Sequence, residues 1–297
     1  TRRKISAFKI IHFSDISDAR KIKSRNFPGA ARFVHEINQE RKIGLAGAEN
    51  MSDFDNILVL FSGDCMGPSI LPCELDKGYH MGNILNRMKV NIGIFGNHEF
   101  DFGVPNLSGF VNQTNFPWVL SNVIDLSTGR PIVHSEESAY IDIGGRPELD
   151  INPIRIGFIG LVEQDWLNNL PEVITNSWQY IDYVDCAREQ CKKLINVLHC
   201  QFIIALTHMR WLHDERLQRL VPEIDLILGG HDHKLEVRAG GPIKRDKLAK
   251  LDKFISEIPP NSTQSLMSGH QPNRDRSFND NNCQKVKCLP EKTKLPL

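Results

Sequence analysis

Polar residues of the kinds that bind divalent metal ions follow five apolar runs in this sequence. Carboxylate, amide and imidazole groups are ligands that suit Zn, Mn or Fe. Each group stands directly after an apolar run of strand length, or within three residues of one, so we expect a metal site built from strand ends. In chain order the groups are Asp15, Gly63-Asp64, Gly96-Asn97-His98, Thr207-His208 and Gly229-Gly230-His231-Asp232-His233.

Asp64 is our candidate for a ligand shared by two metal ions, because the two oxygens of one carboxylate can each serve one ion. Two ions about 3.5–4 Å apart can share a hydroxide and clamp a phosphate during in-line attack. A neighbouring histidine that is not itself a ligand can then stabilise the developing charge or protonate the leaving oxygen. These residue types therefore indicate hydrolysis of a phosphoester.

Two polar residues beside these groups are expected to have structural roles. His12 lies within the expected strand, three residues before Asp15, which favours a packed strand histidine over a ligand. Glu99 follows His98, and we expect it to be structural rather than a general base.

The elements that would carry the groups alternate between strand and helix. Continuous apolar runs are typical of strands that are buried on both faces of a sheet. Strand–helix alternation predicts an α/β layered architecture, with the chemistry at the carboxyl ends of the strands. The expected strands cover residues 8–12, 57–62, 91–95, 117–120, 139–143, 154–160, 202–206 and 225–228, and the expected helices cover residues 30–40, 78–88, 183–198 and 214–220.

Composition and charge limit the classes of partner. The chain has 297 residues, of which 40% are hydrophobic, enough for a sizeable core. Lys plus Arg and Asp plus Glu both number 36, so the net charge is zero and favours neither nucleic acid nor an acidic membrane. The longest apolar runs are of strand length, so we expect no transmembrane helix. None of these totals indicates an oligomeric state.

The number and spacing of the cysteines indicate in which cellular compartment the protein works. The seven cysteines are scattered, and none forms a CxxC pair, so we expect them to be mostly reduced and the protein to be cytoplasmic. The chain begins with Thr1 rather than Met, and Asn-x-Ser/Thr triplets start at Asn106, Asn112 and Asn261. A leader removed from the N-terminus would change the expectation to an extracellular protein.

The composition changes near residue 240. Residues 240–297 contain many Asn, Lys and Asp residues, one Gly-Gly-Pro segment and one Pro-Pro-Asn-Ser-Thr segment, and they show no strand-like apolar run. We therefore expect residues 1–239 to form a catalytic domain and residues 240–297 to form a mostly flexible tail.

The order of the polar groups resembles that of the calcineurin-like metallophosphoesterases, and most closely their 5′-nucleotidase branch. The resemblance covers about residues 6–234 and implies a layered α/β/β/α sandwich of two sheets. It is carried by the segments Gly29-Ala30-Ala31-Arg32-Phe33, Ser62-Gly63-Asp64, Gly96-Asn97-His98-Glu99-Phe100-Asp101-Phe102-Gly103, Ser121-Asn122, Thr207-His208-Met209-Arg210 and Gly229-Gly230-His231-Asp232-His233.

The resemblance implies two divalent metal ions (Mn, Zn, Fe or Mg) and a role for each matched residue. His98, oriented by Asp101, is similar to the catalytic dyad that stabilises the transition state. Asp15, Asp64 and His233 are similar to the ligands of metal one, and Asp64, Asn97, His208 and His231 to those of metal two.

The sequence departs from the family pattern in two places. Ser17 stands where family members usually have histidine, so we expect metal one to be weakly held. In 5′-nucleotidases a carboxy-terminal domain stacks the nucleoside base between aromatic rings, and this chain leaves the pattern just after His233.

Two functions of different classes follow. The first is metal-dependent hydrolysis of nucleotides or small phosphomonoesters, in which a hydroxide held by the metals attacks phosphorus with help from His98. The second is a catalytically weak or inactive relative that serves as a binding or scaffold protein, which Ser17 and the missing domain favour. Retention of the matched polar residues argues for the first.

Overall fold

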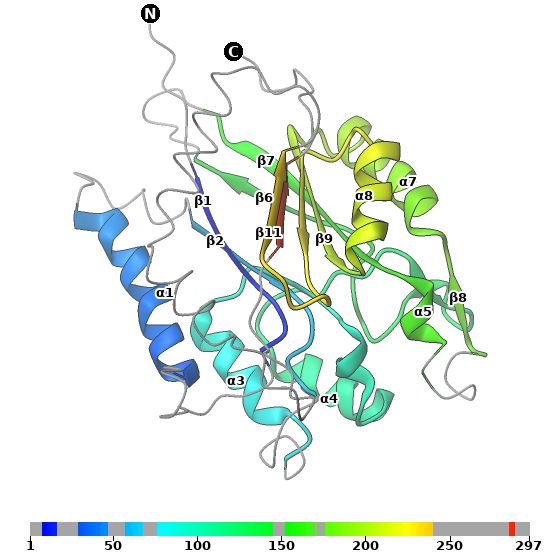
Figure 1. The fold of residues 1–297 in the computed structure, drawn as a ribbon, viewed down its shortest axis with the longest axis horizontal. Coiled ribbons are helices and arrows are strands. Elements are labelled where there is room, and N and C mark those ends of the chain that lie inside the picture. Colours follow the sequence, from blue (N-terminus) through cyan, green and yellow to red (C-terminus); the bar gives the residue numbers. More distant parts are fainter. Residues whose placement is uncertain are drawn as a thin grey trace, which may run out of the picture.

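A computed structural model shows two β-sheets packed face to face and covered by helices on both outer sides (Figure 1). It describes residues 8–16, 29–46, 57–67, 76–144, 152–168, 170, 176–239 and 285–288. The expected α/β/β/α order is confirmed. One hydrophobic cluster lies between the two sheets, and two others each join the outer face of one sheet to its helices.

The first sheet is parallel, with strand order β1-β2-β3. Its strands are β1 (Lys9–Phe13), β2 (Ile57–Ser62) and β3 (Ile92–Ile94). Every residue of β2 is buried, as expected for a continuous apolar run at the centre of a sheet. Because the three strands run the same way, their carboxyl ends lie at one edge.

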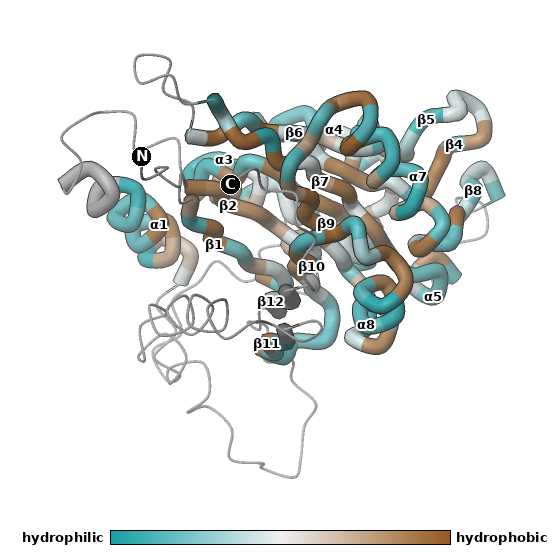
Figure 2. The backbone as a smooth tube through the Cα atoms, turned by 90° about the horizontal axis from the view of Figure 1, so that it is seen from above, coloured by the Kyte–Doolittle hydropathy of each residue, from teal (hydrophilic) through white to brown (hydrophobic). Residues whose placement is uncertain are grey.

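The second sheet has six strands in the order β11-β12-β10-β9-β7-β6. The central strands β7, β9 and β10 are parallel, and β6 pairs antiparallel with β7. Figure 2 shows hydrophobic stretches of β2, β7 and β9 inside the molecule. The bounds are β6 (Ala139–Ile143), β7 (Ile154–Val162), β9 (Phe202–His208), β10 (Leu226–Gly229), β11 (Glu236–Ala239) and β12 (Lys285–Cys288).

Strand β12 corrects one expectation from the sequence. We expected no strand after residue 240, but Lys285–Cys288 lies between β10 and β11, antiparallel to the first and parallel to the second. Main-chain hydrogen bonds can add a strand to a sheet edge without an apolar sequence pattern, which explains the miss. The rest of the expected flexible tail lies outside the described residues.

A small antiparallel sheet flanks the sandwich. It consists of β5 (Arg130–Pro131), β4 (Val123–Asp125) and β8 (Trp178–Tyr180) in that order. The stretch expected as a strand at residues 117–120 forms only isolated bridges, Gly93 with Trp118 and Val119 with Glu136.

Helices cover the outer face of each large sheet. Side chains from α1, α3 and α4 pack with the first sheet, and side chains from α7 and α8 pack with the second. Among the described residues, no helix is both long and apolar enough to cross a membrane. The bounds are α1 (Gly29–Ala46), α3 (Tyr79–Met88), the 3-10 helix η3 (Asn97–Phe100), α4 (Val104–Gln113), α5 (Gln164–Leu167), α7 (Tyr183–Asn196) and α8 (Trp211–Leu220).

Two helices differ from the sequence-based expectation. Helix α1 continues to Ala46, although the helix expected from the sequence ended at residue 40. Helix α4 was not expected at all. It begins after Gly103, whose φ of +81° favours glycine, and carries a proline in its first turn.

Candidate metal centre

The loops that follow β2 and β3 meet at the centre of the candidate site. Gly63 has a φ of +83°, a conformation that favours glycine. A Cβ atom added there would lie 2.5 Å from the backbone nitrogen of Gly96 and 2.8 Å from Nδ1 of His208. A Cβ atom added at Gly96 would collide with Oδ1 of Asp64. Both glycines are therefore required, because polar side chains occupy the space beside them.

His208, at the end of β9, is fully buried with one ring nitrogen facing Asp64. Its Nδ1 lies 2.7 Å from the carbonyl oxygen of Ser62 and donates to it. Its Nε2 lies 3.1 Å from Oδ2 of Asp64, a charge contact that lacks hydrogen-bond geometry. Burial disfavours the charged imidazole, but Asp64 outweighs it and raises the pKa of His208 to about 10. A histidine that donates one ring N–H to a backbone carbonyl, as Nδ1 does here, presents its other nitrogen in a fixed direction, which is the usual arrangement of a metal ligand.

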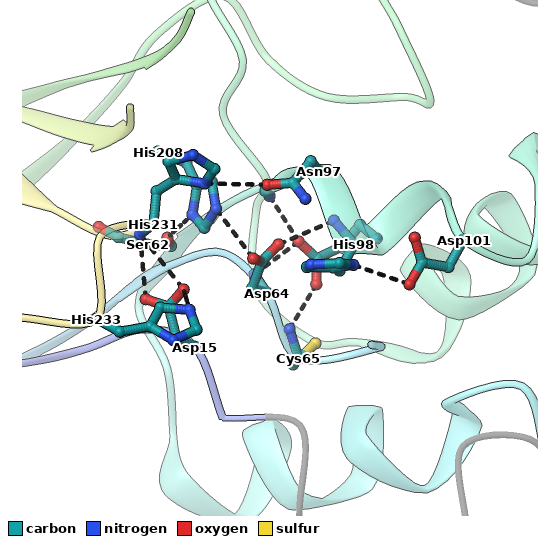
Figure 3. A network of polar contacts seen from close by, with 12 residues as sticks. Asp15, Ser62, Asp64, Cys65, Asn97, His98, Asp101, His208, His231 and His233 are labelled. Atoms are coloured by element: carbon teal, nitrogen blue, oxygen red, sulfur yellow. Dashed lines mark hydrogen bonds and ion pairs between the residues drawn. The ribbon is translucent and has the colours of Figure 1, made fainter. Parts of the chain in front are cut away.

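His231 completes a cluster with Asp64 and His208. One potential ligand atom from each of these three side chains lies within 4.8 Å of the others. Nδ1 of His231 is 3.2 Å from Oδ1 of Asn97 (Figure 3). Burial, followed by the charge of His208, lowers the pKa of His231, which favours the neutral form that binds metals. The donor set therefore fits a divalent cation of the Zn, Mn or Fe type.

Asp15 and His233 form a second group beside the first. Nε2 of His233 lies 3.1 Å from Oδ1 of Asp15, and the backbone nitrogen of His231 donates to the same carboxylate over 3.2–3.3 Å. The backbone nitrogen of Asp15 donates to the carbonyl oxygen of Gly63 over 2.9 Å, which holds the end of β1 against the β2 loop. Ser17, expected to weaken this group, lies outside the described residues.

His98 and Asp101 lie on the other side of Asp64 in Figure 3. Nδ1 of His98 is 2.9 Å from Oδ2 of Asp101, and the backbone nitrogen of His98 donates to Oδ1 of Asp64 over 2.9 Å. Burial lowers the pKa of His98, but the bond to Asp101 and nearby carboxylates outweigh it, so the pKa is raised. The side chain is 30% exposed, so the ring is open to solvent.

Glu99 holds the two loops together. Its fully buried carboxylate accepts hydrogen bonds from the backbone nitrogens of Asp64 (2.8 Å), Cys65 (2.6 Å) and Gly96 (2.5 Å). Burial raises the pKa of Glu99. The structural role expected from the sequence agrees with this geometry.

Sequence reasoning missed Glu163. This residue follows β7, is 2% exposed, and has Oε1 3.7 Å from Nε2 of His231. The signal was present in the sequence, because Glu163 also stands directly after an apolar strand, the pattern that identified the other groups.

The calcineurin-like phosphoesterase model matches residues 8–235. The chain belongs to that family. The segment that matches contains all eight candidate residues. Its relatives place it in the 5′-nucleotidase-like branch.

Two curated relatives illustrate the similarity. The 2′,3′-cyclic-nucleotide 2′-phosphodiesterase/3′-nucleotidase of Haemophilus influenzae is 26% identical over 62% of this chain and 30% of the relative. The snake venom 5′-nucleotidase of Gloydius brevicauda is 25% identical over 75% of this chain and 36% of the relative. This chain therefore spans well under half the length of either protein.

Solved structures show the same fold. A 5′-nucleotidase precursor from Thermus thermophilus aligns with a TM-score of 0.58 and 24% identity over 80% of this chain and 44% of that one. The NAD nucleotidase NadN of Haemophilus influenzae aligns with a TM-score of 0.60 and 21% identity over 82% of this chain and 45% of that one. The layered α/β fold is thus that of 5′-nucleotidase structures.

Proposed function

We propose that this metallophosphoesterase hydrolyses nucleotides or small phosphomonoesters in the manner of a 5′-nucleotidase. The observation that carries the proposal is the cluster of buried Asp64 and His208 with half-buried His231, whose ligand atoms lie within 4.8 Å of one another. Without a cation, the carboxylate and the two imidazoles lie close together but make few hydrogen bonds to one another, as Nε2 of His208 shows. A divalent cation would satisfy all three.

The proposed ligands fall into two sets that share Asp64. Asp64 suits the shared position because its Oδ2 lies 3.1 Å from Nε2 of His208 and its side chain stands between the Asp15–His233 group and His98 in Figure 3. Metal one would be held by Asp15, Asp64 and His233, and metal two by Asp64, Asn97, His208 and His231.

His98 is the proposed catalytic residue, and Asp101 its positioning residue. Nδ1–H of His98 donates a hydrogen bond to Asp101, which leaves Nε2 to face a substrate. The raised pKa of His98 favours the protonated ring, so that Nε2 can donate to a phosphoryl oxygen or to the leaving oxygen. When bound, the two cations would polarise the phosphoryl group and lower the pKa of a water molecule.

The substrate class rests on the relatives. The names of the Haemophilus and snake venom proteins are those of nucleotidases and a cyclic-nucleotide phosphodiesterase. A nucleotide or another small phosphomonoester is therefore our proposed substrate.

The cysteine pattern is the basis for a separate proposal, namely that the protein is cytoplasmic.

The test combines a metal count with turnover. The protein is stripped with a chelator, reloaded with Mn²⁺, and assayed with p-nitrophenyl phosphate and nucleoside monophosphates. We expect bound metal and metal-dependent hydrolysis in the native protein, and neither in Asp64→Asn. The control is Asp185→Asn on α7, whose carboxylate pairs only with exposed Arg188 in the contacts described. Bound metal without hydrolysis of any phosphoester would favour the binding or scaffold role instead.

A further inference from the structure

Glu163 occupies a position that the fold places beside the metal centre. Strands β7 and β9 are parallel neighbours, and Val162 pairs in register with His208. Glu163 therefore leaves β7 directly next to the strand end that carries a proposed ligand. Its side chain is 3% exposed, so its charge is removed from bulk water.

Three side chains surround the Glu163 carboxylate. Nε of Arg210 lies 3.0 Å from both of its oxygens. Nε2 of His213 lies 2.8 Å from Oε2. Nε2 of His231 lies 3.7 Å from Oε1, a charge contact that is longer than a hydrogen bond.

The first two partners compensate the buried charge. A buried carboxylate is costly unless it is paired and hydrogen-bonded, and Arg210 and His213 supply both. The hydroxyl of Tyr183 lies 3.0 Å from Nδ1 of His213, which orients that ring. Arg210 is held further by Asp165. The carboxylate therefore keeps its position without help from His231.

The third contact has a different consequence. The two ring nitrogens of His231 face different groups, Nε2 towards Glu163 and Nδ1 towards Oδ1 of Asn97. A neutral imidazole carries its proton on one nitrogen and a lone pair on the other. The charged carboxylate near Nε2 and the neutral amide oxygen of Asn97 near Nδ1 compete for that proton, and the carboxylate is the stronger acceptor. A proton on Nε2 leaves the lone pair on Nδ1, the nitrogen beside Asn97.

We propose that Glu163 is a positioning residue of the metal centre, which selects the Nε2–H tautomer of His231 and so presents Nδ1 to the cation. Arg210 and His213 hold Glu163 in place for this task. The inference rests on the proposed function only in taking His231 as a metal ligand. A purely structural Glu163 would instead do no more than fasten α8 to the end of β7.

The decisive variant is Glu163→Gln, which keeps the size of the side chain and removes its charge. The matched control is Asp165→Asn, which removes a neighbouring carboxylate that also pairs with Arg210 but is not among the described contacts of His231. Both are studied as metal-free protein and during titration with Mn²⁺. The ¹⁵N shifts of His231, assigned with His231→Gln, report its tautomer before any metal is added.

We expect native protein and Asp165→Asn to carry the His231 proton on Nε2, and Glu163→Gln to show a mixture of tautomers. Affinity for Mn²⁺ should fall by about 10–100-fold in Glu163→Gln, the usual range for loss of a group that supports a metal ligand. The melting temperature of the metal-free protein reports the fastening role separately. If Glu163→Gln does not fold, Glu163→Asp tests the same point, because it keeps the charge but withdraws it by one methylene.

Two results would overturn the inference. One is a native His231 whose proton lies on Nδ1. The other is a folded Glu163→Gln protein with unchanged Mn²⁺ affinity, whether or not its melting temperature falls. Failure of the proposed function has a different signature, namely native protein that binds Mn²⁺ with the expected tautomer but hydrolyses no phosphoester.

Discussion

Four of the proposed ligands have backbone conformations that residues other than glycine rarely adopt. Their φ angles are positive: 55° at Asp15, 63° at Asp64, 82° at His231 and 49° at His233. Each costs about 1–2 kcal/mol relative to an ordinary conformation. Hydrogen bonds across the strand ends offset this cost, among them the bond from the backbone nitrogen of Asp15 to Gly63. Strain of this kind, held by surrounding contacts, is typical of functional sites.

At the residue scale, His98→Ala should separate catalysis from metal binding. His98 contacts Asp101 through its side chain and Asp64 only through its backbone nitrogen, so removing the ring leaves the proposed ligands in place. We expect unchanged Mn²⁺ content and a kcat lower by about 10²-fold or more. The control is His35→Ala, an exposed histidine on α1. Loss of metal from His98→Ala would instead make His98 a ligand.

The raised pKa of His208 predicts that metal binding releases a proton. In the metal-free protein Asp64 raises the pKa of His208 to about 10, so the ring is charged at pH 7.5. Coordination requires the neutral ring, and affinity should therefore rise with pH by up to about one log unit per pH unit below that value. Calorimetric titrations with Mn²⁺ in two buffers of different ionisation enthalpy should show about one proton released. A release near zero would mean that His208 is already neutral.

At the scale of the elements, the site depends on how closely two loops approach. The loops after β2 and β3 touch at Gly63 and Gly96, and Glu99 bonds to the backbone of both. Parallel strands put these loops at the same edge of the sheet, and β9 and β10 add His208 and His231 from the opposite sheet. The site thus lies where the ends of both sheets meet.

Gly96→Ala tests this approach. The φ of Gly96 is −101°, which alanine can adopt, so the only penalty is steric. The added methyl group would collide with Oδ1 of Asp64 and lie 2.7 Å from Nε2 of His208. We expect loss of Mn²⁺ binding, measured by calorimetry, from a protein that still folds.

The control for that variant is Gly129→Ala. Gly129 has a φ of +66°, and nothing lies within 4 Å of an added Cβ atom. Backbone strain should destabilise this variant by about 1 kcal/mol while metal binding stays normal. Normal metal binding in Gly96→Ala as well would show that the loops can separate freely.

At the scale of the whole molecule, a buried histidine links the two sheets. Nε2 of His12 lies 2.9 Å from the hydroxyl of Ser62, and that hydroxyl donates to the carbonyl oxygen of Leu228 over 3.0 Å. His12 belongs to β1 and Leu228 to β10, so the chain of bonds crosses the sandwich. Burial lowers the pKa of His12 to about 3, partly offset by Asp15.

The stability of the metal-free protein should therefore depend on pH through His12. The unfolded chain binds a proton at this histidine near pH 6.5, whereas the folded protein does so only near pH 3. Stability is thus fully present above pH 6.5 and is lost as pH falls through this window, by about 2 kcal/mol between pH 7 and pH 5. Urea unfolding of native protein and His12→Asn at both pH values measures the difference, which should shrink in the variant. Equal pH dependence in both proteins would exclude His12 as the cause.

The sequence by itself determined which residues could form the site. Asp64, Asn97 and His208 each stand two residues after an apolar run, and the carboxyl ends of parallel strands meet at one edge of a sheet. Local pattern and that one rule predicted an α/β architecture with a metal site at the strand ends, whereas the two-sheet sandwich and the role of each ligand came from the resemblance to the family. The structural role of Glu99 was also expected, although its three backbone partners were not.

Tertiary structure decided what depends on distant contacts. The surroundings of Glu163 form only when the chain folds. Arg210 and His213, at the start of α8, pack against the end of β7, and His231 follows β10. These three residues lie 47, 50 and 68 positions after Glu163 in the sequence (210 − 163, 213 − 163 and 231 − 163). Strand β12 joins the sheet through backbone hydrogen bonds, which have no side-chain signature in the sequence. A local sequence pattern can show which strand a residue follows. The burial and partners of a charged side chain depend on the distant chain segments that pack around it.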